Sequence, residues 1–289
     1  MKKLIIEVGS TVTKVDLYNG EFLEKLPGVT IQFKKNYNEE KKLKTDDVNV
    51  LIESINKLKD ITDNIYVCGT SIFRTLPKSE LEEFLKDFKN RTNLDFHIIS
   101  QEEENELTVK GVARLTNKRL GVMIGGGGST EIAIYDNEII ESKNSSIGVI
   151  DVMQKFPDLA DDIATTSLEE VMEYIKENIN LPENKADILV LAGGGHKYFA
   201  ENSGISYTDN TLYQDTNAPI MMDIETRIKD SKRYYENISL DEIRNRVEDP
   251  NWWYATRAMC AFVLVIAEKL EAKYIVPTDI AMAYGLIEE

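Results

Sequence analysis

Residues 125–131 bring together four glycines, a serine, a threonine and a glutamate between two apolar segments. Glycine lacks a Cβ, so another group can approach its backbone closely. A turn of this composition presents backbone N–H groups, with the Ser129 and Thr130 hydroxyls beside them, to an anion such as phosphate. An ordinary flexible hairpin turn is also rich in glycine, and the run alone does not distinguish the two interpretations.

A second candidate for chemistry is the acidic stretch that includes Glu102, Glu103, Glu104 and Glu106. A glutamate at the mouth of a cleft can act as a general base that takes a proton from water. Acidic residues also stabilise the first turn of a helix by interacting with its dipole, without any role in catalysis. Arg74, with its fixed pair of donors, is suited to binding a phosphate.

Two hairpins must position these groups, one at the start of each half of the chain. The turn GSTVT joins strand-like segments at residues 4–8 and 14–18. The Gly-rich run joins similar segments at 120–123 and 132–135. Each hairpin therefore has a small, polar tip and leads into alternating strands and helices, which indicates an internal duplication.

The polar residues 116–119 lie between the two halves and mark the best boundary. We therefore predict two α/β domains, residues 1–117 and 118–289, with their phosphate-binding turns facing each other across a cleft.

Apolar periodicity predicts the remaining elements. In the first half we expect helices at 46–59, 79–91 and 101–115, strands at 64–70 and 96–100, and a solvated loop at 34–44. In the second half we expect helices near 149–156, 168–178, within 219–247, 254–270 and 279–287, and strands at 188–195 and 273–278.

Composition excludes several classes of partner. The chain has 289 residues, of which 42% are hydrophobic and 29% charged, and a net charge of −16. Sequence-independent binding of nucleic acid requires an excess of lysine and arginine, so we expect no nucleic-acid partner. The longest apolar stretch, residues 258–267, is much shorter than the ~20 residues that span a bilayer, so we expect no membrane association.

The cysteines and the start of the chain indicate a reducing compartment. Cys68 and Cys260 are too few and too far apart for a disulfide framework or a cysteine-rich metal cluster. The opening residues MKKLIIEVGS lead into a strand and lack the apolar region of a signal peptide. We therefore expect a cytoplasmic protein.

Taken in order, the motifs resemble the exopolyphosphatase and guanosine pentaphosphate phosphohydrolase family, within the actin-like, sugar-kinase-like and heat-shock-chaperone-like ATPase superfamily. The matching segments are IEVGST near the start, GTSIFRTLP at 69–77, HIISQEEENELTVKGV at 97–112, IGGGGSTEIAI at 124–134, SSIGVIDVMQKF at 145–156, VLAGGG at 190–195 and VPTDIAMAYGLI at 276–287. The block at 97–112 is the most specific, because EVGSTVTK is shared with many kinases of the superfamily. The resemblance implies two actin-like (ribonuclease-H-like) α/β domains with an interdomain cleft.

The resemblance also implies a reaction. Water would remove the terminal phosphate from inorganic polyphosphate or from a guanosine penta- or tetraphosphate, with Mg²⁺ or another divalent cation as cofactor. Proteins of this resemblance are commonly homodimers. Glu104 matches the catalytic base, Arg74 a phosphate-binding arginine, and Glu7 and Glu131 the residues near the metal.

The remaining site residues follow from the same comparison. The phosphate-binding turns would comprise Gly9, Ser10, Thr11, Gly126, Gly127, Gly128, Ser129 and Thr130. A further nucleotide or phosphate contact is implied by Gly193, Gly194 and Gly195, because VLAGGG lies where the superfamily's kinases bind nucleotide.

Four positions depart from the family pattern. Glu7 replaces an aspartate but keeps an oxygen ligand for magnesium. Ile124 also replaces an aspartate and cannot bind a metal. Asp151 replaces a basic residue, and the closing arginine-glutamate-glycine signature reads Ala283, Tyr284 and Gly285. These changes weaken the cationic or metal-binding character of the site.

Three functions therefore remain open. The first is a magnesium-dependent phosphoanhydride hydrolase in which Glu104 activates water. The second is a weakened family member that binds guanosine tetra- or pentaphosphate, or another nucleotide, as a sensor; Ile124 and Ala283 favour it. The third is an ATPase or small-molecule kinase of the same superfamily, favoured by EVGSTVTK and VLAGGG.

Overall fold

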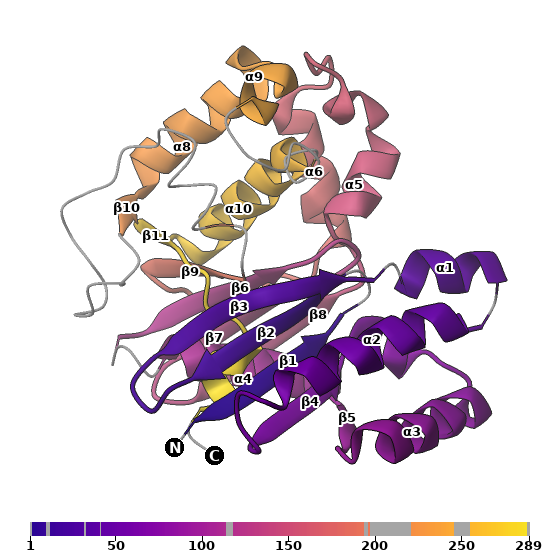
Figure 1. Ribbon diagram of the computed structural model, residues 1–289. Helices are drawn as coiled ribbons and strands as arrows, with labels where there is room; N and C mark the ends of the chain where they lie inside the picture. The colour runs from indigo at the N-terminus through magenta and orange to yellow at the C-terminus, as the bar shows by residue number, and fades with distance from the viewer. Residues whose placement is uncertain are drawn as a thin grey trace. The chain divides into compact units, whose positions relative to one another are not determined.

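The computed structural model describes residues 2–9, 12–31, 33–40, 42–113, 118–193, 196, 221–245 and 255–287. Among the predicted site residues, Ser10, Thr11, Gly194 and Gly195 lie outside this part of the chain. The chain divides into two compact units, one formed by Met1–Leu107 with Met282–Glu289 and the other by Thr108–Ala281. Each unit is built around a β-sheet with helices packed against it (Figure 1).

The sheet of the first unit has the strand order β3-β2-β1-β4-β5. Its strands are β1 (Lys3–Val8), β2 (Val12–Tyr18), β3 (Leu23–Thr30), β4 (Ile65–Gly69) and β5 (Phe96–Ile98). The first three form an antiparallel meander, whereas β1, β4 and β5 run parallel. The carboxyl ends of the three parallel strands therefore meet at one edge, which is where open α/β sheets bind ligands.

Helices α1 (Phe33–Glu40), α2 (Thr45–Leu58) and α3 (Lys78–Thr92) contribute to the core on one face of this sheet. Helix α2 buries Val48, Leu51, Ile52 and Ile55, which recur at helical spacing. The prediction of a loop at 34–44 was wrong. Helix α1 occupies part of it, and its first residue, Phe33, is buried with its ring edge-on to Phe73 at 5.3 Å.

The other face of the first sheet carries Ile5, Cys68 and Ile99. These pack against Leu107 of α4 (Gln101–Ala113) and against the C-terminal 3-10 helix Met282–Leu286. A Cβ on Gly285 would lie 2.0 Å from the Leu107 carbonyl oxygen, so this close approach requires glycine. Residues from 282 onward thus belong to the first unit, whereas the sequence placed them in a domain spanning 118–289.

The sheet of the second unit has the order β10-β11-β9-β6-β7-β8. Its strands are β6 (Leu120–Gly125), β7 (Thr130–Tyr135), β8 (Ile139–Ser145), β9 (Ile188–Ala192), β10 (Met222–Asp223) and β11 (Tyr274–Pro277). Strands β6, β7 and β8 form an antiparallel meander, and β6, β9 and β11 run parallel. This repeats the arrangement of the first sheet, as the two similar hairpins in the sequence predict.

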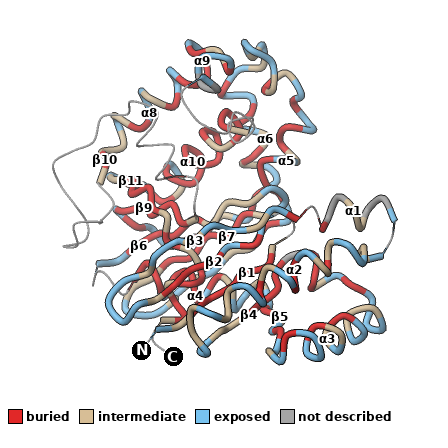
Figure 2. Tube along the Cα trace, viewed as in Figure 1, coloured by how far each residue is buried: buried red, intermediate tan, exposed pale blue. Residues whose placement is uncertain are grey.

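Several helices complete the second unit: α5 (Val149–Lys155), α6 (Leu168–Asn178), α8 (Ile224–Lys232), α9 (Leu240–Arg244) and α10 (Thr256–Leu270). Short 3-10 helices lie at Ser71–Arg74 in the first unit and Pro157–Ala160 in the second, and a π-helical turn lies at Arg233–Asn237. Helix α10 is almost entirely buried, as is strand β9 (Figure 2). The apolar stretch at 258–267 is therefore a core helix.

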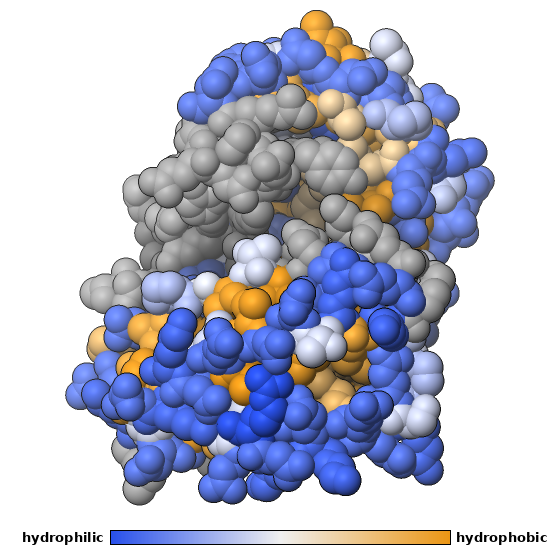
Figure 3. Space-filling view, turned by 45° about the vertical axis from the view of Figure 1, so that its right-hand side comes forward, coloured by the Kyte–Doolittle hydropathy of each residue, from blue (hydrophilic) through white to orange (hydrophobic). Residues whose placement is uncertain are grey.

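Hydrophilic side chains predominate in the coloured part of the face shown in Figure 3, with hydrophobic side chains visible between them. In the part of the chain that the structure describes, no helix combines the length and apolar character needed to cross a membrane.

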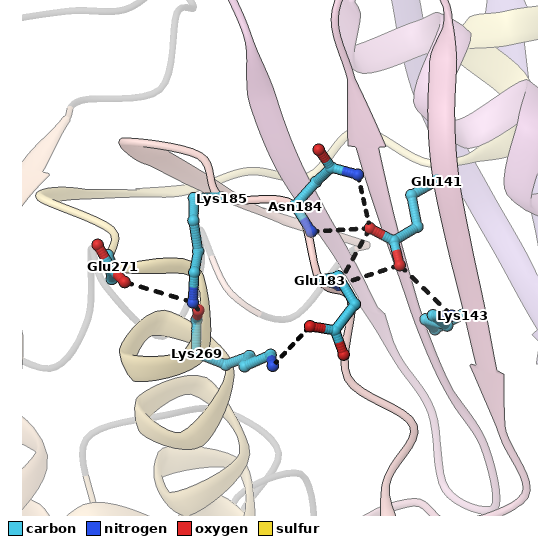
Figure 4. Close-up of polar contacts among 7 residues, drawn as sticks. All are labelled: Glu141, Lys143, Glu183, Asn184, Lys185, Lys269 and Glu271. Atoms are coloured by element: carbon cyan, nitrogen blue, oxygen red, sulfur yellow. Dashed lines mark hydrogen bonds and ion pairs between the residues drawn. The ribbon is translucent and has the colours of Figure 1, made fainter.

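The outer edge of β8 is covered by the segment that precedes β9. The Glu141 carboxylate accepts hydrogen bonds from the backbone N–H groups of Glu183, at 3.0 and 3.1 Å, and Asn184, at 2.9 Å (Figure 4). The Asn180 side chain also donates to the Asn144 carbonyl at 2.8 Å. The contact to the Asn144 carbonyl occupies a backbone group of an edge strand that would otherwise be open to pairing with another chain.

Candidate functional site

In the first unit, charged residues gather at the carboxyl end of β1. The register of the β1–β2 hairpin places Glu7 directly opposite Lys14, and the Lys14 ammonium lies 2.8 Å from the Glu7 carboxylate. Glu7 is buried, whereas the Lys14 side chain is half exposed. The negative charge of Glu7, with smaller effects from Glu104 and Asp16, raises the pKa of Lys14 above its ordinary value. Lys14 therefore lies within the field of three carboxylates.

Arg74 and Glu104 form an ion pair in the same unit. Arg74 ends the 3-10 helix that follows β4, and Glu104 lies in the first turn of α4. The guanidinium Nη2 donates to Glu104 Oε2, while Nε donates to the Ile99 carbonyl at 2.7 Å. The contact with the Ile99 carbonyl restrains the guanidinium, and the guanidinium in turn restrains the Glu104 carboxylate. Both side chains remain partly exposed, so a ligand can reach them.

The structure separates the glutamates of the acidic stretch. Glu102, Glu103 and Glu106 are exposed, whereas Glu104 is partly buried and paired with Arg74. The start of α4 is also capped, because the Ser100 hydroxyl accepts the Glu103 N–H at 3.1 Å. The exposed glutamates fit the role of acidic residues at a helix start, and Glu104 differs from them because it is partly buried and paired with an arginine.

In the second unit, the Gly-rich loop (residues 126–129) turns between β6 and β7. The Gly126 N–H closes the turn on the Ser129 carbonyl at 2.9 Å. The Gly126 and Gly127 carbonyls accept the N–H groups of Val149, at 3.1 Å, and Ile150, at 2.8 Å, from the start of α5. In a trans peptide the N–H points opposite to the carbonyl. The N–H groups of Gly127 and Gly128 therefore point away from α5.

The glycines of this loop do not adopt a positive φ, so their effect is to leave the backbone uncovered by side chains. Among the glycines that the structure describes, only Gly20 and Gly193 have a positive φ. A Cβ on Gly128 would meet nothing closer than the Asp151 carboxylate, at 4.0 Å. The space over Gly128 is thus open to a ligand.

Gly148 and Asp151 fix the shape of the Gly-rich loop, and sequence reasoning did not identify this role. A Cβ on Gly148 would lie 2.4 to 2.5 Å from backbone atoms of Gly126, Gly127 and Gly128. The Asp151 carboxylate accepts the Gly148 N–H at 2.8 Å. The signal in the sequence is a glycine at a helix start followed three residues later by an acid, the spacing of a capping interaction.

Thr130 and Glu131 lie at the start of β7 and are both buried. The Thr130 hydroxyl donates to the Ile147 carbonyl at 2.8 Å, which ties the loop to the segment before α5. Glu131 pairs in register with Ile124 on β6. Since opposed residues of an antiparallel pair lie on the same face, an apolar side chain neighbours the Glu131 carboxylate.

The carboxylates predicted to hold a metal lie in different units, Glu7 in the first and Glu131 in the second. No group of three or more His, Cys, Asp or Glu side chains that could hold a metal ion occurs among the described residues. The donor chemistry of Glu7 nevertheless fits Mg²⁺, which commonly uses one or two carboxylates together with substrate phosphates and water.

Gly193 follows β9 with a φ of 104°, and its N–H donates to the Ile280 carbonyl at 2.7 Å. This conformation favours glycine. His196, three residues later, is buried; burial, with a contribution from the charge of Arg227, lowers its pKa to about 3. The imidazole is therefore neutral near pH 7.

Comparisons with known proteins bear on the family and the fold of the chain. The model of the Ppx/GppA phosphatase family matches residues 27–248. No curated protein matches the sequence.

Solved structures show the same fold at low sequence identity. The Aquifex aeolicus member of the Ppx/GppA protein family aligns with a TM-score of 0.82 and 19% identity, over 99% of this chain and 96% of that one. An exopolyphosphatase from Cytophaga hutchinsonii aligns at 0.76 and 14%, over 100% and 97%. Nucleoside triphosphate hydrolases from Neospora caninum align at 0.62 and 10%, over 99% and 91%. The two-domain actin-like α/β fold is thus confirmed.

Proposed function

Since this chain belongs to the Ppx/GppA phosphatase family, we propose that it is a phosphoanhydride hydrolase that releases the terminal phosphate of inorganic polyphosphate or guanosine pentaphosphate. The family supports phosphohydrolase activity of the exopolyphosphatase type. The choice between these substrates is part of our proposal.

The ion pair of Arg74 and Glu104 carries the proposal. In the free protein the two side chains hold each other in place. A phosphate that binds the guanidinium competes with the carboxylate for its N–H donors, because each anion can present two oxygens to that planar group. Glu104 is then available to accept a proton from the attacking water, while Arg74 stabilises negative charge on the phosphoryl oxygens.

Each unit has further groups that could attract a phosphate, Lys14 in the first and the Gly-rich loop in the second. The Lys14 ammonium is half exposed on a flexible stem, so it can turn toward a phosphate oxygen. The N–H groups of Gly127 and Gly128 would bind a phosphate group through the backbone. Glu7 would hold a divalent cation in the first unit, and Glu131 is the candidate ligand for a cation or a water in the second. Bound there, the cation would neutralise charge that develops during phosphoryl transfer.

A binding protein for guanosine tetra- or pentaphosphate is the second candidate. The observation that favours it is the register of Ile124 with Glu131, which puts an apolar residue beside the buried carboxylate. Such a protein would bind the nucleotide without releasing phosphate. An ATPase or kinase, the third candidate, would release phosphate from ATP or require an acceptor.

The test measures phosphate release from long-chain polyphosphate, tripolyphosphate, guanosine pentaphosphate and ATP, each with Mg²⁺. Glu104→Gln removes the proposed base, and Glu106→Gln is its matched control because Glu106 is exposed on the same helix. We expect Glu104→Gln to lower the rate at least about 100-fold, the range for loss of a general base, and Glu106→Gln to leave it unchanged. Equal rates in both variants would exclude Glu104 as the base. Tight nucleotide binding without release would select the sensor.

A further inference from the structure

An acidic side chain lies at the Gly-rich loop that we propose binds phosphate. The Asp151 carboxylate reaches back from the first turn of α5 to the Gly148 N–H at 2.8 Å. The same Oδ2 atom lies 4.0 Å from the position that a Cβ on Gly128 would occupy. The carboxylate therefore borders the open space over Gly128.

This arrangement gives one side chain two opposite effects on an anion. As an acceptor for Gly148, Asp151 holds the start of α5, and the Val149 and Ile150 N–H groups there donate to the carbonyls of the Gly-rich loop. That contact keeps the loop N–H groups directed outward, which favours anion binding. As a negative charge within a few ångströms of the bound anion, the same carboxylate repels it.

The repulsion depends on the charge of the ligand, whereas the positioning does not. At about 6 Å in a water-like dielectric, two unit charges repel enough to change a binding constant roughly three-fold. A ligand that places more negative charge near the loop is therefore penalised more. Because exposed charges are screened within ~10 Å at 0.1 M salt, the penalty also falls as salt is added.

We propose that Asp151 is a specificity-determining residue, which admits a single phosphate group to the Gly-rich loop and discriminates against densely charged phosphate chains. This inference rests on the proposed function, because it takes the Gly-rich loop as a phosphate-binding site. It deepens that function by favouring short phosphate chains, such as those of guanosine pentaphosphate, over long polyphosphate.

The test compares binding of orthophosphate and tripolyphosphate by titration calorimetry, in low and high salt. Asp151→Asn removes the charge but keeps an oxygen that accepts the Gly148 N–H, whereas Asp151→Ala removes both. Glu173→Gln removes one exposed carboxylate from α6 of the same unit and serves as the charge control. Gly128→Ala adds a methyl group to the open space over the loop and reports whether the probes bind there.

We expect Asp151→Asn to tighten tripolyphosphate binding at least about three-fold in low salt, with a smaller gain for orthophosphate and a loss of both gains in high salt. Asp151→Ala should tighten tripolyphosphate binding less than Asp151→Asn does, because it also removes the acceptor for the Gly148 N–H. The proposal would be overturned if Asp151→Asn changed the affinity for both probes equally, left it unchanged or weakened it. It would also be overturned if neither probe bound to wild type or to any variant. Phosphate release that still depends on Glu104 would, in each of these cases, leave the proposed hydrolase intact.

Discussion

Glu7 and Lys14 face each other across the β1–β2 hairpin, with the ammonium 2.8 Å from the carboxylate. Glu7 is buried, whereas Lys14 extends toward solvent. The pair therefore stabilises the hairpin that carries the first turn and also keeps a cation at the carboxyl end of β1.

Lys14→Met should destabilise the protein by about 1 to 2 kcal/mol, a buried-pair cost discounted because the ammonium is half exposed. Folding raises the pKa of Lys14 above its ordinary value of 10.5. Its stabilising contribution is therefore fully present below pH 10.5 and is lost as pH rises through the raised pKa. Denaturant unfolding of both proteins between pH 7 and 11 measures this. A stability difference that stayed constant up to pH 11 would contradict the proposed charge pairing.

Gly128→Ala and Gly148→Ala each add one methyl group beside the same loop but should change different properties, anion binding in the first variant and stability in the second. At Gly148 the methyl would overlap three backbone atoms at 2.4 to 2.5 Å, so we expect a loss of stability of several kcal/mol. At Gly128 it meets nothing closer than the Asp151 carboxylate at 4.0 Å, so the fold should be kept and anion binding weakened. Thermal unfolding and phosphate titration of both variants separate the two effects. Destabilisation by Gly128→Ala would show that the loop is packed more tightly than its geometry implies.

The sequence predicted the elements that have strong apolar periodicity. Helix α6 has the bounds expected for it, and the parallel strands lie where the apolar runs are. Strands β3 and β8 were not predicted, because each lies at the edge of the antiparallel meander, where β3 has no buried residue and β8 has only Ser145. Without a buried face, an edge strand lacks the alternation that marks a strand in sequence.

Part of the candidate site could likewise be predicted from the sequence, and part could not. Glycine, serine and acidic residues at the ends of strands pointed to Gly126–Ser129 and Glu104 through composition and resemblance. The pairing of Glu104 with Arg74 joins residues 30 positions apart. Glycine is needed at position 148 because a Cβ there would lie 2.4 Å from the Gly126 carbonyl oxygen. Both depend on how distant segments meet, which periodicity does not encode.

Glu141→Gln should loosen the edge of the second sheet. Burial alone would raise the pKa of the Glu141 carboxyl, but hydrogen bonds from Asn184 and Glu183 outweigh it and lower the pKa to about 2 (Figure 4). The ordinary value is 4.5, so the stabilisation is present above pH 4.5 and is lost as pH falls toward 2.

We expect Glu141→Gln to lower the unfolding midpoint by a few degrees at pH 7, equivalent to about 1 to 2 kcal/mol, and the difference from wild type to shrink below pH 4.5. Glu138→Gln is a suitable control, since Glu138 is exposed in the turn that precedes β8. A difference that grew in acid would contradict the assignment of the ionised carboxylate as the stabilising form.

Arg257 should be the most sensitive polar residue of the second unit. It is buried at the start of α10, and its guanidinium donates to the carbonyls of Leu159 (3.1 Å), Asp161 (2.6 Å) and Asp162 (2.7 Å), with a longer contact to Ile238 (3.4 Å). Loss of the side chain leaves these acceptors without the donor that gathers them, each at a cost of about 1 kcal/mol or more.

Arg257→Met should therefore destabilise the second unit by about 3 to 5 kcal/mol. Arg257→Lys should recover only part of the loss, because one ammonium cannot span carbonyls that a planar guanidinium reaches with two nitrogens. Hydrogen exchange followed by mass spectrometry should show faster exchange in the segment around residues 159–168, where Tyr235 also donates to the Thr166 carbonyl, and unchanged exchange in β1 and β4. Full recovery by lysine would mean that the charge of Arg257, rather than its bidentate geometry, holds this segment.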